Sequence, residues 1–432
     1  MTRKSSRAGG ATKAQDRLIE LFPDTARVED GELVVGGVHA SALADEYGTP
    51  LVTYCRATLL AQARAYARVD PEALVVYGTK AFANVALLRL FAAEGLGADV
   101  STRGELEFAL RAGVPGERIV FHGNNKSDDE LRAAAASGAL VVLDALDEVS
   151  RAERAGVETV LVRLTPGIEA ETHRAIQTAH AESKFGLVAD DAVAAVRAAR
   201  SSGLDVAGLH VHIGSQLTRS AESLLAVERL IDVALHCRTE LGWAPRVFDL
   251  GGGLGVRHSL SDPAVPQPDE FASELLVRLR QHWTEPASVI FEPGRSLVGR
   301  AGITLYRVGG VKQTTGVAYA SVDGGMSDNP RPQLYGSRYD ALLANRADEP
   351  ATGNYRIAGK HCESGDVLIE DVELPEPRRD DVLAVPGTGA YTLAMASNYN
   401  SVPRPAAVLV ADGDAELIRR RESLDDLLAF ES

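Results

Sequence analysis

The chain has 432 residues, of which 45% are hydrophobic, and its formal net charge is −15. That length and apolar content suffice for two domains with sizeable cores. The acidic balance disfavours a nucleic acid or an anionic membrane surface as partner. No apolar run approaches the roughly 20 residues of a membrane span. The three cysteines, Cys55, Cys237 and Cys362, show neither disulfide nor zinc spacing.

The N-terminal segment is polar and basic and holds no apolar stretch, which is typical of a disordered tail and not of a secretory signal. We therefore expect residues 1–15 to be disordered and the protein to be cytoplasmic. Residues 16–49 contain short apolar segments and one expected helix, over 40–48. They are too few to fold alone.

From residue 50, short apolar runs alternate with alanine-rich stretches of helical periodicity. A strand–helix alternation repeated eight times predicts a (β/α)₈ barrel of the TIM type over residues 50–302, with a doubly wound open sheet as the alternative. The eight strand-like runs cover residues 74–80, 97–102, 118–124, 139–145, 159–167, 206–215, 246–255 and 288–296.

After the barrel the rhythm changes to short apolar runs bounded by Gly, Pro and Asp, with no long helix between them. This pattern predicts an all-β domain of Greek-key or sandwich-like type over residues 303–432. We expect residues 16–49 to pack on this domain.

Lys80 ends the first barrel strand, where an apolar run gives way to a loop and a helix. A lysine at this position is either a residue that has reached solvent or an amine nucleophile that forms a Schiff base with an aldehyde cofactor. The active site of such a barrel lies at the C-terminal ends of its strands. Other polar groups and glycines follow the other strands: His122, His212, Ser215, Gly251, Gly252, Gly253, Glu292 and Arg295.

The glycine run 251–253 follows the seventh strand, and the sequence EPGR, 292–295, follows the eighth. Loops after these two strands frequently bind phosphate in such barrels, and glycines let backbone N–H groups approach an anion. The alternative explanation of the glycines is a tight turn. The sequence therefore favours a phosphorylated cofactor between strands seven and eight, opposite Lys80.

His210 and His212 lie two apart on one strand, so both side chains face the same way. Such a pair is also found in metal-dependent hydrolases, which gives an alternative function. No cysteine or carboxylate of ligand spacing accompanies the pair, and we expect no metal. One histidine would instead stack on an aromatic cofactor ring.

Together the motifs resemble the diaminopimelate decarboxylases, which are fold-type III enzymes that depend on pyridoxal 5′-phosphate (PLP). The matching stretches are YGTKAFAN (77–84), SKFG (183–186), HVHIGSQ (210–216), FDLGGGLG (248–255), EPGR (292–295), VDGGMSDNPRPQLYG (322–336), GKHCESGD (359–366) and GAYTLAMASNYN (389–400). One departure is Arg103 in DVSTRGEL, where the family usually has small residues.

The resemblance implies a role for each matching residue. Lys80 would carry PLP, His212 would stack on its pyridine ring, and Cys362 of the partner subunit would donate a proton. Glu292 would keep the pyridine nitrogen protonated, which favours decarboxylation because a protonated ring is the better electron sink. The phosphate would be held by Ser215, Gly252, Gly253, Pro293, Gly294, Arg295 and Tyr391. Substrate would be contacted by Arg295, Arg331, Tyr335, Glu363 and Tyr391.

The implied reaction converts meso-2,6-diaminopimelate into L-lysine and CO₂, the last step of lysine biosynthesis, in a homodimer with shared active sites. The nearest alternatives are sister decarboxylases that act on ornithine, arginine or carboxynorspermidine. A non-catalytic PLP-binding barrel is the alternative from another class. It would need neither a β-domain nor the CESGD stretch, and this chain has both.

Overall fold

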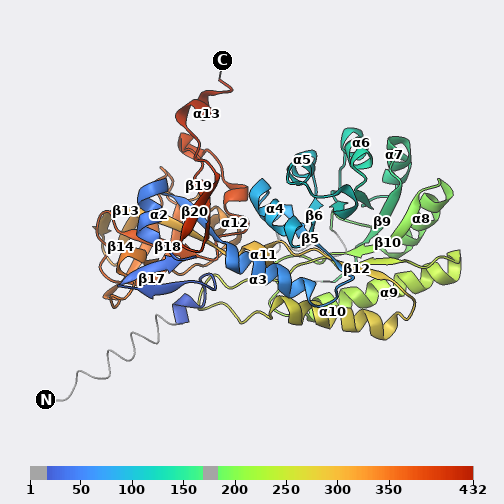
Figure 1. Cartoon of the computed structure of the whole chain (residues 1–432), viewed down its shortest axis with the longest axis horizontal. Helices are drawn as coiled ribbons and strands as arrows, with labels where there is room; N and C mark the ends of the chain where they lie inside the picture. The colour runs from blue at the N-terminus through green and yellow to red at the C-terminus, as the bar shows by residue number, and fades with distance from the viewer. Residues whose placement is uncertain (1–16, 169–182, 432) are drawn as a thin grey trace. The chain divides into compact units, whose positions relative to one another are not determined.

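The computed structural model describes residues 17–168 and 183–431. The predicted tail, residues 1–15, lies outside the described residues. Figure 1 labels the helices and strands. The chain divides into two compact units: a barrel unit (Leu60–Gly255 and Val265–Leu297) and a β-domain (Met1–Leu59, Val256–Ala264 and Val298–Ser432).

Eight parallel strands close the barrel unit, which confirms the predicted (β/α)₈ architecture and excludes an open sheet. The last strand along the chain pairs with the first, with Ile290 opposite Leu74. The barrel strands are β5 (Leu74–Gly78), β6 (Gly97–Val100), β7 (Ile119–Phe121), β8 (Leu140–Leu143), β9 (Thr159–Leu164), β10 (Asp205–Val211), β11 (Val247–Asp249) and β12 (Ser288–Phe291).

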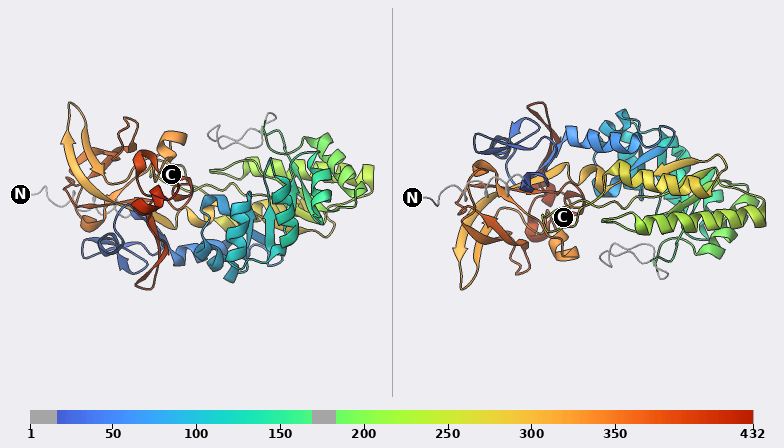
Figure 2. Two further views of the ribbon diagram at one scale, coloured as in Figure 1. Left: turned by 90° about the horizontal axis from the view of Figure 1, so that it is seen from above. Right: turned by 90° about the horizontal axis from the view of Figure 1, so that it is seen from below.

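Helices cover the outside of the barrel (Figure 2). Because parallel strands are then buried on both faces, they are almost continuously apolar. None of the described helices is long and apolar enough to cross a membrane. The helices after β5 are α4 (Val85–Ala93), α5 (Arg103–Arg111), α6 (Asp128–Ser137), α7 (Glu148–Ala155), α8 (Ala189–Ser201), α9 (Ala221–Leu241), α10 (Pro268–His282) and the short α11 (Arg295–Val298), and α3 (Arg56–Ala67) precedes β5.

Local signals fix where these helices begin and end. The side chain of Asn84 caps α4 by accepting hydrogen bonds from the N–H groups of Ala86 and Leu87. A capping box of Ser127 and Glu130 starts α6. The same helix ends at Gly138, whose φ of 74° is a conformation that glycine adopts without strain.

The β-domain contains two sheets. The small one joins β1 (Arg27–Glu29), β2 (Glu32–Val35) and β3 (Val38–His39), and α2 (Ala40–Tyr47) follows it. The large sheet has nine strands. They are β4 (Leu51–Cys55), β13 (Gly302–Gln313), β14 (Ala318–Val322), β15 (Leu342–Leu343), β16 (Gly353–Ala358), β17 (Val367–Leu374), β18 (Val382–Pro386), β19 (Ala406–Ala411) and β20 (Asp414–Arg419), with α12 (Arg331–Tyr335) and α13 (Leu424–Leu428) as short helices.

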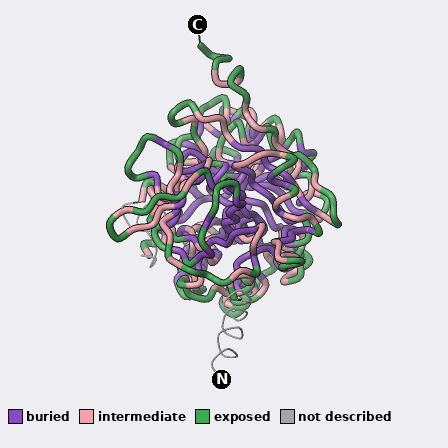
Figure 3. Tube along the Cα trace, turned by 90° about the vertical axis from the view of Figure 1, so that its left-hand side faces the viewer, coloured by how far each residue is buried: buried purple, intermediate pink, exposed green. Residues whose placement is uncertain are grey.

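The N-terminal segment shares the core of this domain, as Phe22 and Leu33 pack in one apolar cluster with Ile303 and Val408. Figure 3 shows this buried interior in purple. The boundary with the barrel differs from the predicted one. Strand β4 lies inside the range predicted for the barrel, yet it pairs with β13 and β19 in the large sheet, because a fully buried apolar run fits the centre of either structure.

Candidate active site

Lys80 lies just beyond the carboxyl end of β5, in the 3₁₀ turn Thr79–Ala81. Its Nζ is 3.6 Å from Oδ2 of Asp99. The side chain of Lys80 is 45% exposed, whereas that of Asp99 is 2% exposed. The amine is therefore accessible to a ligand on one side and faces a buried carboxylate on the other.

Two hydrogen bonds fix the turn that carries Lys80. The hydroxyl of Thr79 donates to the carbonyl of Asp99 over 2.8 Å, and the N–H of Gly78 donates to the carbonyl of Pro293 over 3.1 Å. A Cβ atom on Gly78 would lie 3.3 Å from the Cα of Gly294. The ends of β5 and β6 and the EPGR turn are thus held close together.

Glu292 directly follows β12 and is 6% exposed. Its Oε1 is 2.5 Å from Nε2 of His122, and its Oε2 is 3.2 Å from Nε2 of His210. Burial alone would raise the pKa of Glu292, but the two imidazoles outweigh burial and hold the pKa well below its usual value. The barrel therefore contains a buried carboxylate that stays ionised.

A second buried carboxyl group, Asp249, lies at the end of β11 and completes a cluster with His122, His210 and Glu292. One ligand atom of each lies within 4.8 Å of the others, a donor set that also suits a cation. The hydrogen bonds of Glu292 to both imidazoles already account for this proximity. His212, the other half of the predicted metal pair, is not a member. The absence of a metal stays a prediction.

His212 has a different partner from His210. The N–H of Gly252 donates to Nδ1 of His212 over 3.2 Å, so the proton of the neutral ring is on Nε2. Burial, aided by the charges of Lys80 and Arg163, lowers the pKa of His212 well below its usual value. A neutral imidazole of fixed tautomer suits stacking on an aromatic ring.

The glycine run after β11 is needed for close approach of the backbone. A Cβ atom on Gly252 would lie 2.2 Å from the carbonyl oxygen of Glu292, and Gly253 has a φ of 112°. The N–H of Gly251 donates to Asp249 Oδ1 over 3.0 Å. The tight-turn explanation therefore accounts for these glycines by itself, and a phosphate site must be argued from the side chains around them.

Arg295 and Ser215 supply such side chains. Arg295 is 4% exposed, and its Nη2 and Nε are 3.1 and 3.4 Å from Oγ of Ser215. The structure thus brings together two residues predicted to hold a phosphate, from the ends of β10 and β12. A buried guanidinium beside a hydroxyl is a suitable site for a phosphate dianion.

In the β-domain, Arg331 begins α12 and is 3% exposed. Its Nε donates to Oη of Tyr339 over 3.0 Å and its Nη2 to Oγ of Ser337 over 3.1 Å. Its Cζ lies 5.5 Å from the ring centre of Tyr335. Among the described residues, no carboxylate lies within ion-pair distance of this guanidinium. The charge is thus held by neutral groups.

Cys362 and Glu363 lie on an exposed loop of the β-domain, between two buried residues, His361 and Asp366. Oδ2 of Asp366 accepts hydrogen bonds from the N–H of His361 over 2.9 Å and from its Nδ1 over 2.7 Å. Oδ1 of Asp366 accepts a third, from the N–H of Met326 over 2.7 Å. The exposed thiol thus sits on a firmly anchored loop. Tyr391, with a φ of 57°, is only partly buried.

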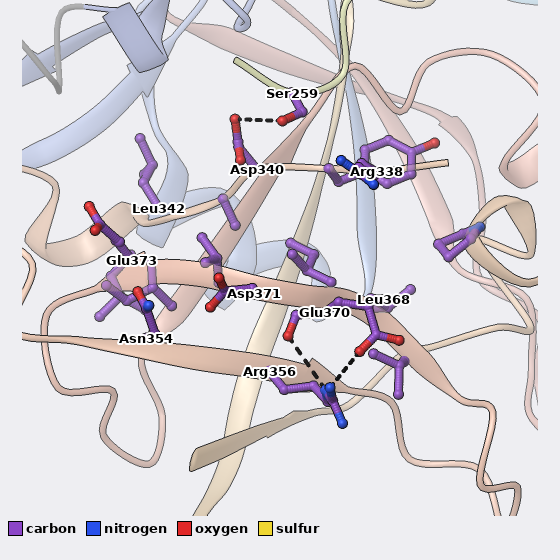
Figure 4. Close-up of a pocket in the computed structure, with 18 of the residues that line it drawn as sticks. Ser259, Arg338, Asp340, Leu342, Asn354, Arg356, Leu368, Glu370, Asp371 and Glu373 are labelled. Carbon is purple, nitrogen blue, oxygen red and sulfur yellow. Dashed lines mark hydrogen bonds and ion pairs between the residues drawn. The ribbon is translucent and has the colours of Figure 1, made fainter. Parts of the chain in front are cut away.

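The β-domain also contains a groove of about 2090 Å³, part of which Figure 4 shows. Some of its polar side chains pair with one another, as Arg346 does with Glu349 over 2.8 Å. Arg356 Nη2 lies 2.8 Å from Oε2 of Glu370, and Ser259 donates to Asp340 over 3.2 Å. Of the predicted site residues, Glu363 lines the groove. The groove is therefore separate from the predicted cofactor residues, which lie at the barrel strand ends.

Residues 56–299 match the family model described as pyridoxal-dependent decarboxylase, pyridoxal binding domain. The chain is 43% identical to the diaminopimelate decarboxylase of Halalkalibacterium halodurans, over 95% of this chain and 98% of that one. The chain belongs to the diaminopimelate decarboxylase family. The relative from Bacillus subtilis is 41% identical over 93% and 96% of the two chains. The structure resembles that of diaminopimelate decarboxylase from M. jannaschii in co-complex with L-lysine, with a TM-score of 0.87 and 32% identity over 95% and 98% of the chains.

The cofactor of the diaminopimelate decarboxylase family is PLP, and the barrel end of this chain fits that group. Lys80 offers an accessible amine for its aldehyde. Glu292 offers an ionised carboxylate for the pyridine nitrogen. Arg295 and Ser215 offer donors for the phosphate, and His212 offers a neutral ring. All of these side chains belong to the barrel unit.

Three charged residues at the barrel end escaped the candidate set: Asp99, Asp249 and Arg163. Nη1 of Arg163 lies 3.4 Å from Oδ1 of Asp144, and its Cζ lies 4.7 Å from the ring centre of Phe185, in the SKFG stretch. Each of the three interrupts an otherwise apolar strand run, a position where charge is depleted. That interruption is the signal that would have found them. Arg103, the departure from the family pattern, starts α5 as an exposed residue.

Proposed function

We propose that this chain decarboxylates meso-2,6-diaminopimelate to L-lysine and CO₂, the last step of lysine biosynthesis. Membership of the family supports the reaction class. The observation that carries the substrate is Arg331, a buried guanidinium without a carboxylate partner among the described residues. Diaminopimelate has an amino-acid group at both ends, so the end that does not react presents a carboxylate. Ornithine and lysine present only an ammonium group there.

When bound, PLP supplies an electron sink for the carbanion that is left when CO₂ departs. Lys80 holds the cofactor through its amine. The carboxylate of Glu292, which is kept ionised by His122 and His210, holds the proton on the pyridine nitrogen. The neutral ring of His212 covers the pyridine face without adding charge.

The remaining cofactor contacts hold the phosphate. Arg295 and Ser215 bind its oxygens, and Tyr391 closes over it. The EPGR turn, with Pro293 and Gly294, and the glycines 252 and 253 give the backbone a shape that lets the phosphate approach. The N–H of Gly252 already donates to His212, so Gly252 contributes shape more than a hydrogen bond.

The substrate is recognised mainly by residues of the β-domain. The guanidinium of Arg331 binds the distal carboxylate in a bidentate pair, and Glu363 meets the distal ammonium. Tyr335, already against the guanidinium, Tyr391 and Arg295 complete the contacts. The thiol of Cys362 then donates the proton that replaces CO₂.

We infer further that the enzyme is a homodimer in which Cys362 and Glu363 of one subunit act with Lys80 of the other. The exposure of both loop residues supports this arrangement, because a reactive group offered to a neighbour must lie at the surface. Cys55, Cys237 and Cys362 are all free thiols. This supports a reducing, cytoplasmic location.

The test is release of lysine and CO₂ from meso-diaminopimelate, measured beside ornithine, arginine and carboxynorspermidine at equal concentrations. We expect turnover of diaminopimelate and little of the others. Preference for ornithine or arginine would assign the chain to a sister reaction. Cofactor binding without turnover of any of the four would favour a cofactor-binding protein.

A further inference from the structure

Two buried carboxyl groups lie side by side at the ends of neighbouring barrel strands. Asp249 is the last residue of β11 and is fully buried, and Glu292 directly follows β12. The two strands pair in parallel, with Asp249 opposite Ile290, and the N–H of Glu292 donates to the carbonyl of Gly251 over 2.8 Å. A ligand oxygen of Asp249 lies within 4.8 Å of one of Glu292.

The two carboxyl groups differ in how many of their oxygens accept a hydrogen bond. Both oxygens of Glu292 are bonded to imidazoles, at 2.5 Å from His122 and 3.2 Å from His210. Oδ1 of Asp249 accepts a hydrogen bond from the N–H of Gly251, over 3.0 Å. Among the described residues, Oδ2 of Asp249 faces no donor. A buried, ionised oxygen without a donor is unfavourable, whereas a proton on Oδ2 turns this atom into a donor.

Cationic side chains on the surrounding strands do not stabilise an ionised Asp249. The cation of Arg163 on β9 is 3.4 Å from Asp144, and that of Lys80 after β5 is 3.6 Å from Asp99. Each cation therefore has its own acid. Two adjacent carboxyl groups in an apolar setting cannot both ionise readily. Burial and the charge of Glu292 raise the pKa of Asp249 well above its usual value.

We propose that Asp249 keeps its proton and donates a hydrogen bond through it to Glu292, so that the pair carries a single negative charge located on Glu292. The inference rests on the proposed role of Glu292 as partner of the pyridine nitrogen. With a third donor, Glu292 becomes a weaker base. The proton then stays on the cofactor nitrogen instead of moving to the carboxylate. Asp249 is thus a positioning residue that tunes the cofactor without touching it.

Two variants separate the neutral form of Asp249 from the ionised one. Asp249→Asn is isosteric and uncharged, since its Oδ1 can still accept from Gly251 and its Nδ2 can donate to Glu292. Asp249→Leu has the same branching at Cγ but is larger and has no donor. With ¹⁵N-labelled PLP, the pyridine nitrogen of Asp249→Asn should keep the chemical shift of the wild type, and that of Asp249→Leu should move toward the unprotonated value. A rise of one unit in the pKa of Glu292 changes the proton distribution about tenfold.

Infrared difference spectra give a readout that does not depend on turnover. The difference spectrum of the wild-type holoenzyme minus Asp249→Asn at neutral pH should contain the stretch of a protonated carboxylic acid, and other buried acids such as Asp328 cancel in this difference. The proposal is overturned if the difference spectrum lacks this band. It is also overturned if Asp249→Leu leaves the nitrogen shift unchanged, or if elemental analysis finds one equivalent of a metal ion that Asp249→Asn removes.

A third variant, Glu292→Gln, separates the proposal on Asp249 from the proposed role of Glu292 as partner of the pyridine nitrogen. If Glu292→Gln leaves the nitrogen shift at the wild-type value, the proposed role of Glu292 fails, and with it the tuning of the cofactor. The carboxylic acid band of Asp249 still decides, independently, whether the two side chains share one proton.

Discussion

The barrel end and the Cys362 loop both rely on a buried acid bonded to histidine, but they use it differently. In the barrel, Glu292 is bonded to His122 and His210 and is itself the candidate partner of the cofactor. In the β-domain, Asp366 is bonded to His361 and to backbone N–H groups. The residues proposed to act there are its exposed neighbours Cys362 and Glu363.

This difference predicts that substitutions in the two units have different effects on cofactor binding. In the barrel, the side chains that bond the strand ends together are also the proposed cofactor contacts, so a substitution there should change how the cofactor is bound. In the β-domain the anchor and the reactive groups are separate residues. A substitution in the loop should therefore remove one chemical role and leave cofactor binding intact.

The largest effect is expected from Lys80→Ala, which removes the proposed point of attachment of the cofactor. Turnover should fall by a factor on the order of 10⁴ or more, the scale seen when a nucleophile is lost. After borohydride reduction, mass spectrometry should find the pyridoxyl group on Lys80 in the wild type and on no residue in the variant. Lys312→Ala, at an exposed position on β13, is the control and should keep both label and turnover. A label on another lysine would contradict the assignment.

Cys362→Ala should remove only the proposed proton donor of the β-domain. We expect PLP to stay bound with an unchanged absorption spectrum while kcat falls by roughly 10²–10⁴, the range for a positioned acid. Because Cys55 and Cys237 are buried, iodoacetamide should label Cys362 first in the native protein, and substrate should slow the labelling. Loss of the cofactor from Cys362→Ala would show that the two units are not separable in this way.

Mixing Lys80→Ala with Cys362→Ala sharpens the comparison further. If each active site takes Lys80 from one subunit and Cys362 from the other, heterodimers contain one intact site. Activity should then return to about one quarter of the wild-type value per subunit pair after full exchange, by the statistics of random pairing and one site in two. No recovery, with subunit exchange verified by mass spectrometry, would place both residues in one subunit.

Arg331→Ala should have a smaller effect, confined to one substrate. The buried guanidinium is held by Tyr339 and Ser337, and removing one member of a buried charge pair costs about 3–5 kcal/mol. We expect kcat/KM for diaminopimelate to fall by at least about 10², with PLP affinity unchanged. Arg338→Ala, an exposed neighbour, is the matched control. Undiminished turnover by Arg331→Ala would contradict the proposal that Arg331 binds the distal carboxylate.

The sequence predicts the barrel well because its strands are buried on both faces and stand out as apolar runs between helical stretches. The same alternation of strands and helices places Lys80, Glu292 and Arg295 at strand ends, which converge in a barrel. The grouping of Arg331 with Tyr335 and of Cys362 with Glu363 came from the family resemblance, because local patterns in a β-domain do not show which loops are functional.

The part that sequence could not provide is pairing between side chains on different strands. Nothing in the order of residues shows that His122 and His210 meet at Glu292, or that Asp249 lies beside it. Nor does it show that the N–H of Gly252 fixes the tautomer of His212. Such contacts depend on the stagger of strands around the barrel. The stagger places residues that are 170 positions apart, such as His122 and Glu292, within hydrogen-bond distance.

The β-domain has a buried acid of its own, Asp328, whose hydrogen bonds contrast with those of the carboxyl pair in the barrel. It is 3% exposed and accepts hydrogen bonds from Oη of Tyr306 over 2.5 Å and from the N–H of Gly325 over 2.8 Å. These two donors only partly offset burial, which raises the pKa of Asp328 to about 7. Asp328 should therefore influence stability and not catalysis.

The sign of this influence follows from proton linkage. In the folded protein Asp328 binds its proton more tightly than in the unfolded chain, where its pKa has the ordinary aspartate value of 3.8. The contribution to the free energy of unfolding is therefore greatest below about pH 4 and falls as the pH rises to about 7, by up to roughly 4 kcal/mol. Asp328→Asn stays neutral and should lose this dependence, so its urea midpoint should exceed that of the wild type more at pH 8 than at pH 5. Asp414→Asn, at an exposed position, should follow the wild type at both pH values. Parallel behaviour of Asp328→Asn and the wild type would mean that the burial of this carboxyl carries no such energetic cost.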